Sequence, residues 1–410
     1  MLNLSSHIQE AAASLVKSQF GADVAPESLN VQETRKEFEG ELTLVIFPLA
    51  KLRLGNLQEV GEKLGGLLVE NLDFVSGYNL VKGFLNLSIS NDYWRNFLIS
   101  YFQSTEFLTR DEGKDTSVVV EFCSPNTNKP LHLGHLRNIV LGSALTQLLK
   151  ANGYKVHPVC LYNDRGVAIC RSMYAWQQDG GNDKPANKKG DAFVGDYYVK
   201  FSDNLKKEVA TLVSGGMDEK EAEKKAPSII AVNEMLVKWE NGDPDTMAIW
   251  KQMNQWVYDA HTNPFQTLGI EFEKFYYESD LYLEGKEIVE EGETAGNFYR
   301  KDDGSVWVDL EDAGLDQKLL LRGNGTSVYI TQDLAGAAHK QADFHIDRSV
   351  YVVGNEQDYH FKVLFEVLKK LEKPYADGLF HLSYGMVELP HGKMKSRAGN
   401  VVEVDDLITE

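Results

Sequence analysis

Cysteine is scarce in this sequence of 410 residues, which contains only Cys123, Cys160 and Cys170. Because no two of them form a CxxC pair, the sequence argues against a disulfide framework and against a structural zinc site. No run approaches the roughly 18 consecutive apolar residues that a membrane-spanning helix needs. Polar residues such as His7 and Glu10 interrupt the N-terminus, which is not typical of a signal peptide. We therefore expect a cytoplasmic protein with no membrane partner and no zinc.

Positive charge is also in short supply. Lysine and arginine together number 42, against 61 aspartates and glutamates, so the formal net charge is −19. This balance argues against broad, nonspecific binding of nucleic acids, which depends on many basic residues, but it leaves room for a local basic face. The apolar content of 43% is ordinary for a globular protein. A chain of this length predicts two or three domains.

Residues 1–110 are expected to form a small, separate α+β domain. Apolar residues with helical spacing open it, and alternating apolar and polar residues follow in two later segments. We find no catalytic constellation in this part of the sequence. The expected elements are a helix from about residue 8, strands over 40–49 and 78–88, and a helix over 57–71.

Residues 111–410 are expected to form an α/β domain built on a parallel sheet. Residues 118–122 are a β-branched, apolar run that is typical of a strand buried on both faces. A helix is expected to begin at Pro130, since the missing N–H of proline costs nothing at the first helical position. The next strand covers 155–161. In such βαβ units ligands bind at the carboxyl ends of the strands, which here means the segment after Glu121.

Two insertions interrupt this second domain. The first, at about 173–268, has a mostly helical pattern, and the second, a connective insertion at about 271–325, has short strand patterns. A lysine-rich run at 220–225 is balanced by glutamates, so its simplest interpretation is a solvated helix face. The sequence stops just after a helix start at Asp405. Because domains seldom end in this way, we expect that a C-terminal domain is absent from the sequence.

A first chemical motif lies at residues 130–135, which read Pro-Leu-His-Leu-Gly-His. It places His132 and His135 at the start of the expected helix, where the backbone amides and the helix dipole favour phosphate oxygens. Imidazole N–H groups can bind the same oxygens, and they do so more strongly as charge develops at phosphorus. Gly134 would let an adenine ring approach the backbone. Two surface histidines on an ordinary helix are the simpler explanation of this pattern taken alone.

A second motif at residues 392–397 reads Gly-Lys-Met-Lys-Ser-Arg and predicts a basic loop. Together with Lys129 it offers three further cations, Lys393, Lys395 and Arg397. A triphosphate under in-line attack requires positive charge near its β and γ groups. Flanking glycines suit a loop that closes on a ligand. A solvated basic loop explains this motif equally well by itself, but the two motifs together indicate a nucleoside triphosphate that is attacked at phosphorus.

Two carboxylates suggest a cationic second substrate. Glu121 ends an apolar strand, and Asp333 is expected where a strand gives way to a helix. A planar guanidinium pairs bidentately with a carboxylate, so arginine chemistry fits such a pair. Gln357 is a further neutral polar candidate. For Asp333 an ordinary helix cap is an equally good explanation.

These residues together resemble a class I aminoacyl-tRNA synthetase, and more narrowly the bacterial type of arginyl-tRNA synthetase. Residues 120–137 resemble the first signature of that family, 162–166 its next strand-end motif, and 329–334, 353–357 and 392–400 its later blocks in the same order. The resemblance implies a Rossmann-like class I catalytic domain with helical insertions and an additional N-terminal α+β domain. Contact between this N-terminal domain and tRNA is our hypothesis.

The resemblance implies a two-step reaction. The carboxylate of L-arginine attacks the α-phosphorus of ATP to give arginyl-adenylate and pyrophosphate, and the arginyl group then passes to the 3′-end of tRNA(Arg). Mg²⁺ would accompany the triphosphate without a fixed protein ligand. We expect a monomer with no organic cofactor.

The resemblance also implies the residues of the site. The catalytic residues would be Lys129, His132, His135, Lys393 and Arg397; the ATP-binding residues Gly134, Gly354, Val387, Lys395 and Ser396; and the arginine-binding residues Glu121, Asn126, Tyr329, Asp333 and Gln357. No metal ligand is expected among them.

The sequence departs from the family pattern in two ways. The usual class I loop reads KMSKS, whereas Ser396 here replaces the second lysine. Lys129 matches a lysine that is thought to compensate in related arginyl enzymes, and Lys395 and Arg397 stay open as alternatives. The helical anticodon-binding domain of the family is not found at the C-terminus. Since family members generally need tRNA to activate arginine, this sequence could bind both small substrates and turn over poorly.

Two other functions compete with this one. A class I synthetase for another amino acid, or an adenylyltransferase, would share the HxGH pattern, but Glu121, Asp333, Tyr329 and Gln357 favour a cationic side chain. A non-catalytic, synthetase-like binding protein is the second alternative. The presence of His132, His135 and Lys393 argues against this alternative, because a non-catalytic protein has no physical reason to keep them.

Overall fold

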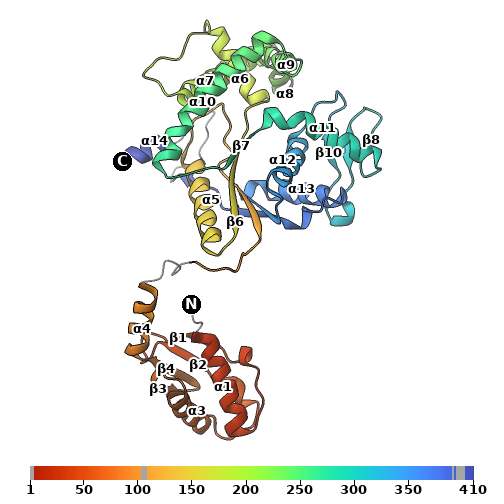
Figure 1. The fold of residues 1–410 in the computed structure, drawn as a ribbon. Helices are drawn as coiled ribbons and strands as arrows, with labels where there is room; N and C mark the ends of the chain where they lie inside the picture. Colours follow the sequence, from red (N-terminus) through yellow and green to blue (C-terminus); the bar gives the residue numbers. More distant parts are fainter. Residues whose placement is uncertain (1–3, 103–108, 390–391, 394–401) are drawn as a thin grey trace. The chain divides into compact units, whose positions relative to one another are not determined.

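The computed structural model describes residues 4–102, 109–389, 392–393 and 402–410, with only the backbone described at Leu389, Gly392 and Lys393. It divides into two compact units, Met1–Leu108 and Thr109–Glu410, which are considered separately (Figure 1). None of the described helices is both long enough and apolar enough to cross a membrane. In the same residues no group of three or more His, Cys, Asp or Glu side chains could hold a metal ion.

The first unit packs helices against an antiparallel sheet whose described strands follow the order β1-β2-β4-β3. Helices α1 and α3 share one core with the sheet, in which Ile8, Leu64 and Leu85 are fully buried. The elements are α1 (Leu4–Phe20), β1 (Val31–Glu33), β2 (Leu42–Val45), α2 (Phe47–Ala50), α3 (Leu57–Asn71), β3 (Val75–Val81), β4 (Phe84–Ile89) and α4 (Asn91–Phe102).

Two strand predictions in this unit need correction. Residues 78–88 do not form one strand, because β3 and β4 pair antiparallel around a turn at Lys82 and Gly83. Both turn residues have positive φ, +49° and +83°, as a tight hairpin requires. The strand expected over 40–49 stops at Val45, and the short helix α2 follows, with a proline in its first turn.

The second unit is built on a parallel sheet with the strand order β12-β11-β5-β6-β7 (Figure 1). The chain begins at β5 in the middle, moves outward to β6 and β7, and then adds β11 and β12 on the other side. The strand order therefore reverses between β5 and β11, where such folds open a crevice at the carboxyl ends of the strands. The predicted Rossmann-like α/β fold is confirmed. The strands are β5 (Ser117–Glu121), β6 (Lys155–Tyr162), β7 (Lys274–Tyr277), β11 (Arg348–Gly354) and β12 (Leu379–Tyr384).

Helices cover both faces of this sheet, which explains the continuous apolar run of β5. Val118 and Val120 pack in one core with Ile139 of α5 (Leu133–Ala151), whereas Val119 packs in another with Leu281 of α11 (Glu278–Thr294). Alternate residues of one strand thus serve two cores, and no polar side is needed. Two more helices of this unit are α12 (Tyr329–Phe344) and α13 (Asp358–Lys370).

Two further segments interrupt the elements of the parallel sheet. The first is helical and lies between β6 and β7, and the second adds a small antiparallel sheet of β10, β9 and β8. The remaining elements are α6 (Val167–Gln178), α7 (Gly190–Ser214), α8 (Glu219–Lys225), α9 (Pro227–Glu240), α10 (Pro244–Thr267), β8 (Tyr299–Arg300), β9 (Val306–Val308), β10 (Lys318–Leu321), β13 (Glu388–Leu389), β14 (Gly392–Lys393) and α14 (Val404–Thr409).

Two helix boundaries also differ from the prediction. The helix expected from Pro130 begins only at Leu133, because His132 keeps an extended backbone (φ −126°, ψ 174°) and serves as the N-cap. Asp333 does not lie at a strand–helix junction. Helix α12 already begins at Tyr329, after an extended residue, so Asp333 belongs to its second turn.

A close helix contact in this unit can be tested directly. An added Cβ at Gly285 of α11 would lie 2.1 Å from the carbonyl oxygen of Thr331 in α12. We expect Gly285→Ala to force the helices apart and to lower the free energy of unfolding by about 1–3 kcal/mol, measured by urea denaturation. Gly336→Ala is the matched control, because its Cβ would meet Leu281 at an ordinary 3.6 Å. Equal losses for both variants would contradict the steric explanation.

Candidate active site at the switch point of the sheet

The N-terminus of α5 holds the two histidines of the first motif. The Nδ1 atom of His132 accepts a hydrogen bond from the backbone N–H of Gly134 (3.1 Å). The backbone N–H of His132 in turn donates to Nδ1 of His135 (3.1 Å), and the two ring centroids are 4.0 Å apart. The two imidazoles therefore cap the first turn reciprocally, in the manner of a capping box.

Both imidazoles are held neutral. Burial and the nearby charge of Lys129 lower the pKa of His132 to about 4, and burial also takes the pKa of His135 well below its ordinary value. Since each Nδ1 accepts a hydrogen bond, the single proton of each ring sits on Nε2. Each ring can then offer a neutral N–H donor to a phosphate beside the helix N-terminus. Burial lowers the pKa of Lys129 as well.

The residues that follow the second motif are paired with the first motif. The backbone N–H of Leu133 donates to the carbonyl of Val402 (2.9 Å), and the backbone N–H of Val404 donates to the carbonyl of Leu131 (2.9 Å). A bridge between His132 and Glu403 completes this short antiparallel edge. Two segments that are far apart in the sequence are thus tied together by backbone hydrogen bonds.

The chain leaves β5 through a strained turn. Cys123 and Ser124 both have positive φ, +77° and +40°. Asn138 of α5 holds the turn: its Oδ1 accepts from the backbone of Cys123 (2.5 Å), while its Nδ2 donates to the carbonyl of Val352 (2.6 Å) and to the hydroxyl of Tyr384 (2.9 Å). One buried amide therefore joins α5 to the turn after β5 and to the strands β11 and β12. Strain of this kind persists where the surroundings enforce it, and it is typical of functional sites.

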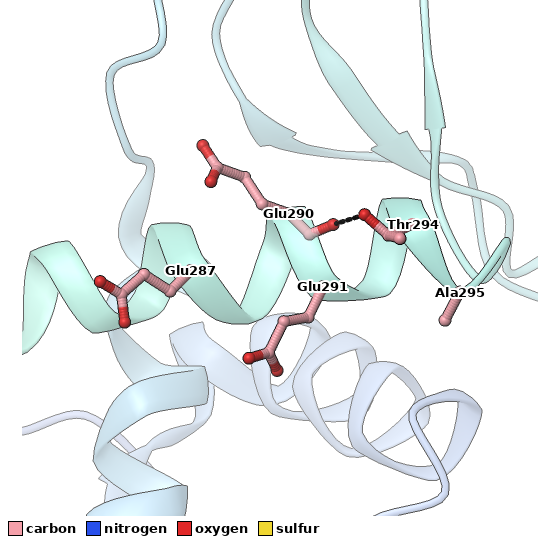
Figure 2. Close-up of a pocket in the computed structure, with 5 residues that line it drawn as sticks. All are labelled: Glu287, Glu290, Glu291, Thr294 and Ala295. Carbon is pink, nitrogen blue, oxygen red and sulfur yellow. Dashed lines mark hydrogen bonds between the residues drawn. The ribbon is translucent and has the colours of Figure 1, made fainter.

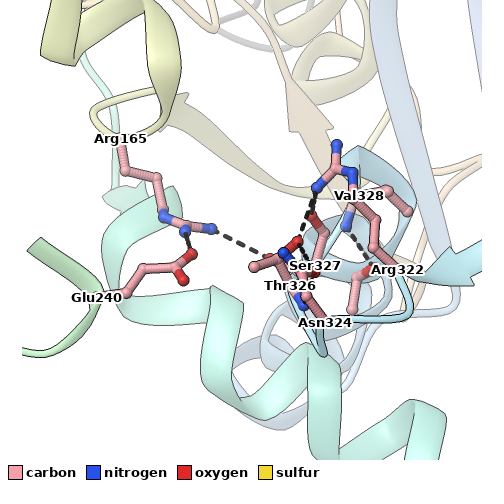
Figure 3. A network of polar contacts seen from close by, with 8 residues as sticks. Arg165, Glu240, Arg322, Asn324, Thr326, Ser327 and Val328 are labelled. Atoms are coloured by element: carbon pink, nitrogen blue, oxygen red, sulfur yellow. Dashed lines mark hydrogen bonds and ion pairs between the residues drawn. The ribbon is translucent and has the colours of Figure 1, made fainter. Parts of the chain in front are cut away.

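A pocket of about 440 Å³ lies between the helical insertion and α12. Asn126 and Tyr329, both expected to bind arginine, line it. Three residues that were not among the expected site residues line it too, namely Arg165, Glu278 and Gln332, of which only Glu278 lies outside the motif blocks 162–166 and 329–334. Figure 3 shows the side of this pocket on which Arg165 pairs with a glutamate of the insertion.

Glu278 is the main residue that sequence reasoning missed. It is the first residue of α11, directly after β7, and only 4% of its surface is exposed. Burial and the charges of Asp333 and Asp164 raise the pKa of its carboxyl to about 8, while Arg165 opposes the rise. A buried carboxylate at the carboxyl end of a parallel strand is a strong candidate for ligand binding. The available signal was its place directly after the aromatic run 275–277.

Two other residues expected to bind arginine lie outside the lining of this pocket. Asp333 is half-buried and pairs with Nε2 of His360 (2.6 Å). Although burial works against the charged ring, the hydrogen bond and the charge of Asp333 raise the pKa of His360. Gln357 is exposed in the short turn before α13. The negative charge of Asp333 nevertheless acts on the pocket, because it raises the pKa of Glu278 in the pocket lining.

Glu121 is engaged inside the protein. It is 5% exposed, and its carboxylate pairs with the ammonium of Lys340 on α12. That ammonium also lies 4.2 Å from the ring centroid of Tyr351. Burial disfavours the charge on Lys340, but Glu121 and Tyr351 together outweigh this effect and raise the pKa of the ammonium. The ion pair ties β5 to α12, and a contact between Glu121 and arginine stays a prediction.

The residues expected to bind ATP are described only in part. Gly354 ends β11 and is tightly packed, since a Cβ there would lie 2.7 Å from the sulfur of Met386. Val387 is half-buried after β12. Lys393 lies on β14, whose backbone pairs with β13. Three more expected residues lie outside the described residues: Lys395, Ser396 and Arg397.

An open hollow of about 510 Å³ on α11 is unsuited to a nucleotide (Figure 2). Its lining includes Glu287, Glu290 and Glu291. Figure 2 shows these side chains extending from the helix without a basic residue among those drawn. Three carboxylates repel a triphosphate, so the two histidines offer the better phosphate site.

Comparison with known proteins identifies the family. Residues 99–410 match the family model of tRNA synthetases class I (R), catalytic domain. The chain is 50% identical over 399 residues to an arginine–tRNA ligase of Bacteroides thetaiotaomicron, a match that covers 96% of this chain and 67% of that protein. The chain belongs to the class I arginyl-tRNA synthetases. A ligase of the same name from Amoebophilus asiaticus is 48% identical over 411 residues, covering 100% of this chain and 69% of the relative.

Solved structures carry the same fold as this member of the arginyl-tRNA synthetase family. The Thermus thermophilus arginyl-tRNA synthetase gives a TM-score of 0.69 at 22% identity and covers 99% of this chain and 69% of that one. The Plasmodium falciparum enzyme gives 0.66 at 17% identity, with 99% and 67% covered. The chain thus spans about two thirds of the length of the relatives and structures that it matches.

The raised pKa of Glu278 has a consequence for stability. A carboxyl with a folded pKa of about 8 and an ordinary value of 4.5 makes the fold lose stability as pH rises between these values. Each unit of the shift corresponds to about 1.4 kcal/mol. We therefore expect Glu278→Gln to raise the melting temperature at pH 8 more than at pH 5, measured by calorimetry. Glu287→Gln, an exposed change on the same helix, should give no such pH-dependent gain.

Proposed function

We propose that this chain activates L-arginine with ATP and transfers it to tRNA(Arg). In the first step a carboxylate oxygen of arginine attacks the α-phosphorus of ATP, and the bond to the pyrophosphate oxygen breaks. In the second step a ribose hydroxyl at the 3′-end of tRNA attacks the acyl carbon and loses its proton, and AMP leaves. The observation that carries the proposal is the buried carboxylate of Glu278, in a pocket reached by the loop between β5 and α5.

The guanidinium of arginine would bind between Glu278 and Asp333. These two carboxylates interact through their charges, and a planar cation between them would relieve the repulsion. Asn126 and Tyr329 line the pocket and would contact the amino acid through an amide and a hydroxyl. The side chain of lysine, a competing cationic amino acid, ends in an ammonium group that lacks the planar fork of a guanidinium.

Glu121 and Gln357 stay in the proposed arginine set. For Glu121 the support is indirect, since its ion pair with Lys340 holds the helix that carries Asp333. Gln357 stands at the N-cap of α13, beside the strand end at Gly354. Both assignments are predictions that substitutions would test.

ATP would bind at the N-terminus of α5. The Nε2 donors of His132 and His135 would hold its phosphates, and the developing charge at phosphorus would strengthen these hydrogen bonds. Mg²⁺ would arrive with the triphosphate, since magnesium favours phosphate oxygens and water. The other residues in this proposal are Lys129, Gly134, Gly354, Val387, Lys393, Lys395, Ser396 and Arg397.

The affinity for arginine should depend on pH. Below about pH 8 the free carboxyl of Glu278 carries a proton, which the guanidinium must displace. We therefore expect affinity to rise by up to about tenfold per pH unit between roughly pH 6.5 and 8 and then to level off. Titration calorimetry with arginine measures this directly, with lysine, glutamine and the neutral analogue citrulline as comparisons.

Glu278→Gln separates the possible outcomes of this titration. The variant should lose both the affinity for arginine and its pH dependence while it keeps its affinity for ATP. If arginine bound the variant as well as the wild type, Glu278 would not be its partner. ATP binding without selectivity among amino acids would favour an adenylyltransferase or a synthetase for another amino acid.

The first unit carries a pocket that suits an unstacked base of tRNA. It measures about 200 Å³ and is lined by Phe38, Phe84 and Asn86, with Arg35 and Lys82. The Oδ1 atom of Asn86 accepts from Thr43 (2.6 Å), while its buried Nδ2 has no partner among the described residues. Aromatic rings that stack on a base, an amide that reads its edge and basic residues for the backbone are typical of single-stranded RNA recognition. We therefore assign this pocket to tRNA.

Removal of the exposed ring tests this assignment. Phe38 is 40% exposed, and stacking of one base contributes about 1–3 kcal/mol, so Phe38→Ala should weaken tRNA(Arg) binding roughly 5- to 100-fold. Arginine and ATP affinities should not change. Trp94→Ala is the control, because this ring is equally exposed (41%) but does not line the pocket. Equal losses for the two variants in a filter-binding assay would contradict a specific base site.

The expected monomeric state and cytoplasmic location belong to the same proposal. Light scattering at working concentrations tests the first. Fractionation of cells that express the protein tests the second.

A further inference from the structure

Arg165 lines the amino-acid pocket and is held on several sides. It lies shortly after β6, and only 5% of its side chain is exposed. Its guanidinium pairs with Glu240 at the end of α9 (2.7 Å) and lies over the rings of Tyr282 (4.1 Å) and Trp239 (5.2 Å). It also donates to the hydroxyl of Ser327 (3.2 Å), as Figure 3 shows. Its position is therefore fixed by the helical insertion and by the segment before α12 together.

A buried amide leads from Arg165 to Glu278. With its nitrogen toward the carboxylate, Gln332 donates to Oε1 of Glu278 (2.8 Å), and its oxygen accepts from Nη1 of Arg165 (2.7 Å). The reverse orientation would set like partners against each other, so the hydrogen-bond chemistry selects this one. An ionised carboxylate has more acceptor sites than one amide fills, which leaves capacity for a cationic ligand.

The neighbouring residue holds the same junction from another side. Asp164 is 1% exposed, and its carboxylate accepts from the backbone N–H (2.9 Å) and the hydroxyl (2.7 Å) of Ser279. Two consecutive residues after β6 are thus connected by hydrogen bonds to two consecutive residues after β7. Asp164 holds Ser279 directly, and Arg165 holds Glu278 through Gln332.

We propose that Arg165 is a positioning residue for amino-acid selection, which orients the carboxylate of Glu278 through Gln332. The inference rests on the proposed function, in which Glu278 receives the guanidinium of the substrate. Through the ion pair with Glu240, the helical insertion becomes part of the machinery that selects arginine. None of this requires Arg165 to touch the substrate.

The charges around Glu278 define what the test should measure. Asp164 after β6 and Asp333 on α12 disfavour its ionised form, whereas Arg165 favours it. Loss of the charge of Arg165 should therefore raise the pKa of Glu278 further. The next charged groups outward are Glu240, His360 and Arg322.

The experiment is calorimetric titration of the full chain with arginine and, separately, with ATP, from about pH 6.5 to 9.5. Arg165→Met should weaken arginine binding at least about tenfold at neutral pH and shift the levelling-off of affinity upward by roughly one unit. ATP affinity should stay unchanged. Arg165→Lys restores the charge but not the planar fork, so it should return the pH profile toward that of the wild type while affinity stays low.

Arg171→Met is the matched control, because this arginine also lies over an aromatic ring in the insertion (Phe201, 5.5 Å) but does not line the pocket. It should leave both titrations unchanged. If Arg165→Met fails to fold, Gln332→Met and Glu240→Gln take its place: each should weaken arginine binding and spare ATP binding.

Different results would contradict the positioning role of Arg165 and the proposed function. An unshifted pH profile in a folded Arg165→Met protein, or equal losses for arginine and ATP, would overturn the positioning role. If the wild-type chain itself showed no pH-dependent arginine binding, the proposed function would fail first, whatever the variants did.

Discussion

A carboxylate buried next to other carboxylates is the constraint around which the amino-acid pocket is arranged. Burial raises the pKa of Glu278 to about 8, and Asp333 and Asp164 add to the rise. Its ionised form is costly while the pocket is empty, because water is excluded and like charges lie close. A guanidinium relieves this cost, whereas a neutral side chain of the same length does not. In the proposed function, selectivity for a cation would follow from the instability of the empty site.

At the proposed phosphate end of the site, the side chains are kept neutral instead of charged. His132 and His135 cap the helix with Nδ1 and are held neutral, so they present N–H donors instead of fixed positive charges. Fully charged imidazoles would repel each other and the nearby ammonium of Lys129. In the proposed ATP site, neutral donors and the partial charge of the helix N-terminus would hold a phosphate without this penalty.

The sequence predicted what local pattern determines. The buried strand β5, the histidine motif and the parallel fold follow from residues that are close together in the chain. Glu278 could not be found in this way, because its environment is made by Asp333, Gln332 and Arg165 from distant segments. The hairpin at Lys82 was missed because apolar alternation continues through the turn, and its only local signal was the following glycine.

Parallel strands of the sheet fix both ends of the helical insertion, β6 before it and β7 after it. The chain enters the insertion at the carboxyl end of β6, just after Arg165, and leaves it at the amino end of the neighbouring parallel strand β7, which leads to Glu278. Glu240, far inside the insertion, returns to pair with Arg165 at its entry. An insertion that only needed to be tolerated would have no reason to bury an ion pair there, because such pairs contribute little net stability. Removing one partner, however, would leave a buried charge beside the pocket. The pair is therefore better explained by the orientation that it imposes on the pocket than by the stability of the fold.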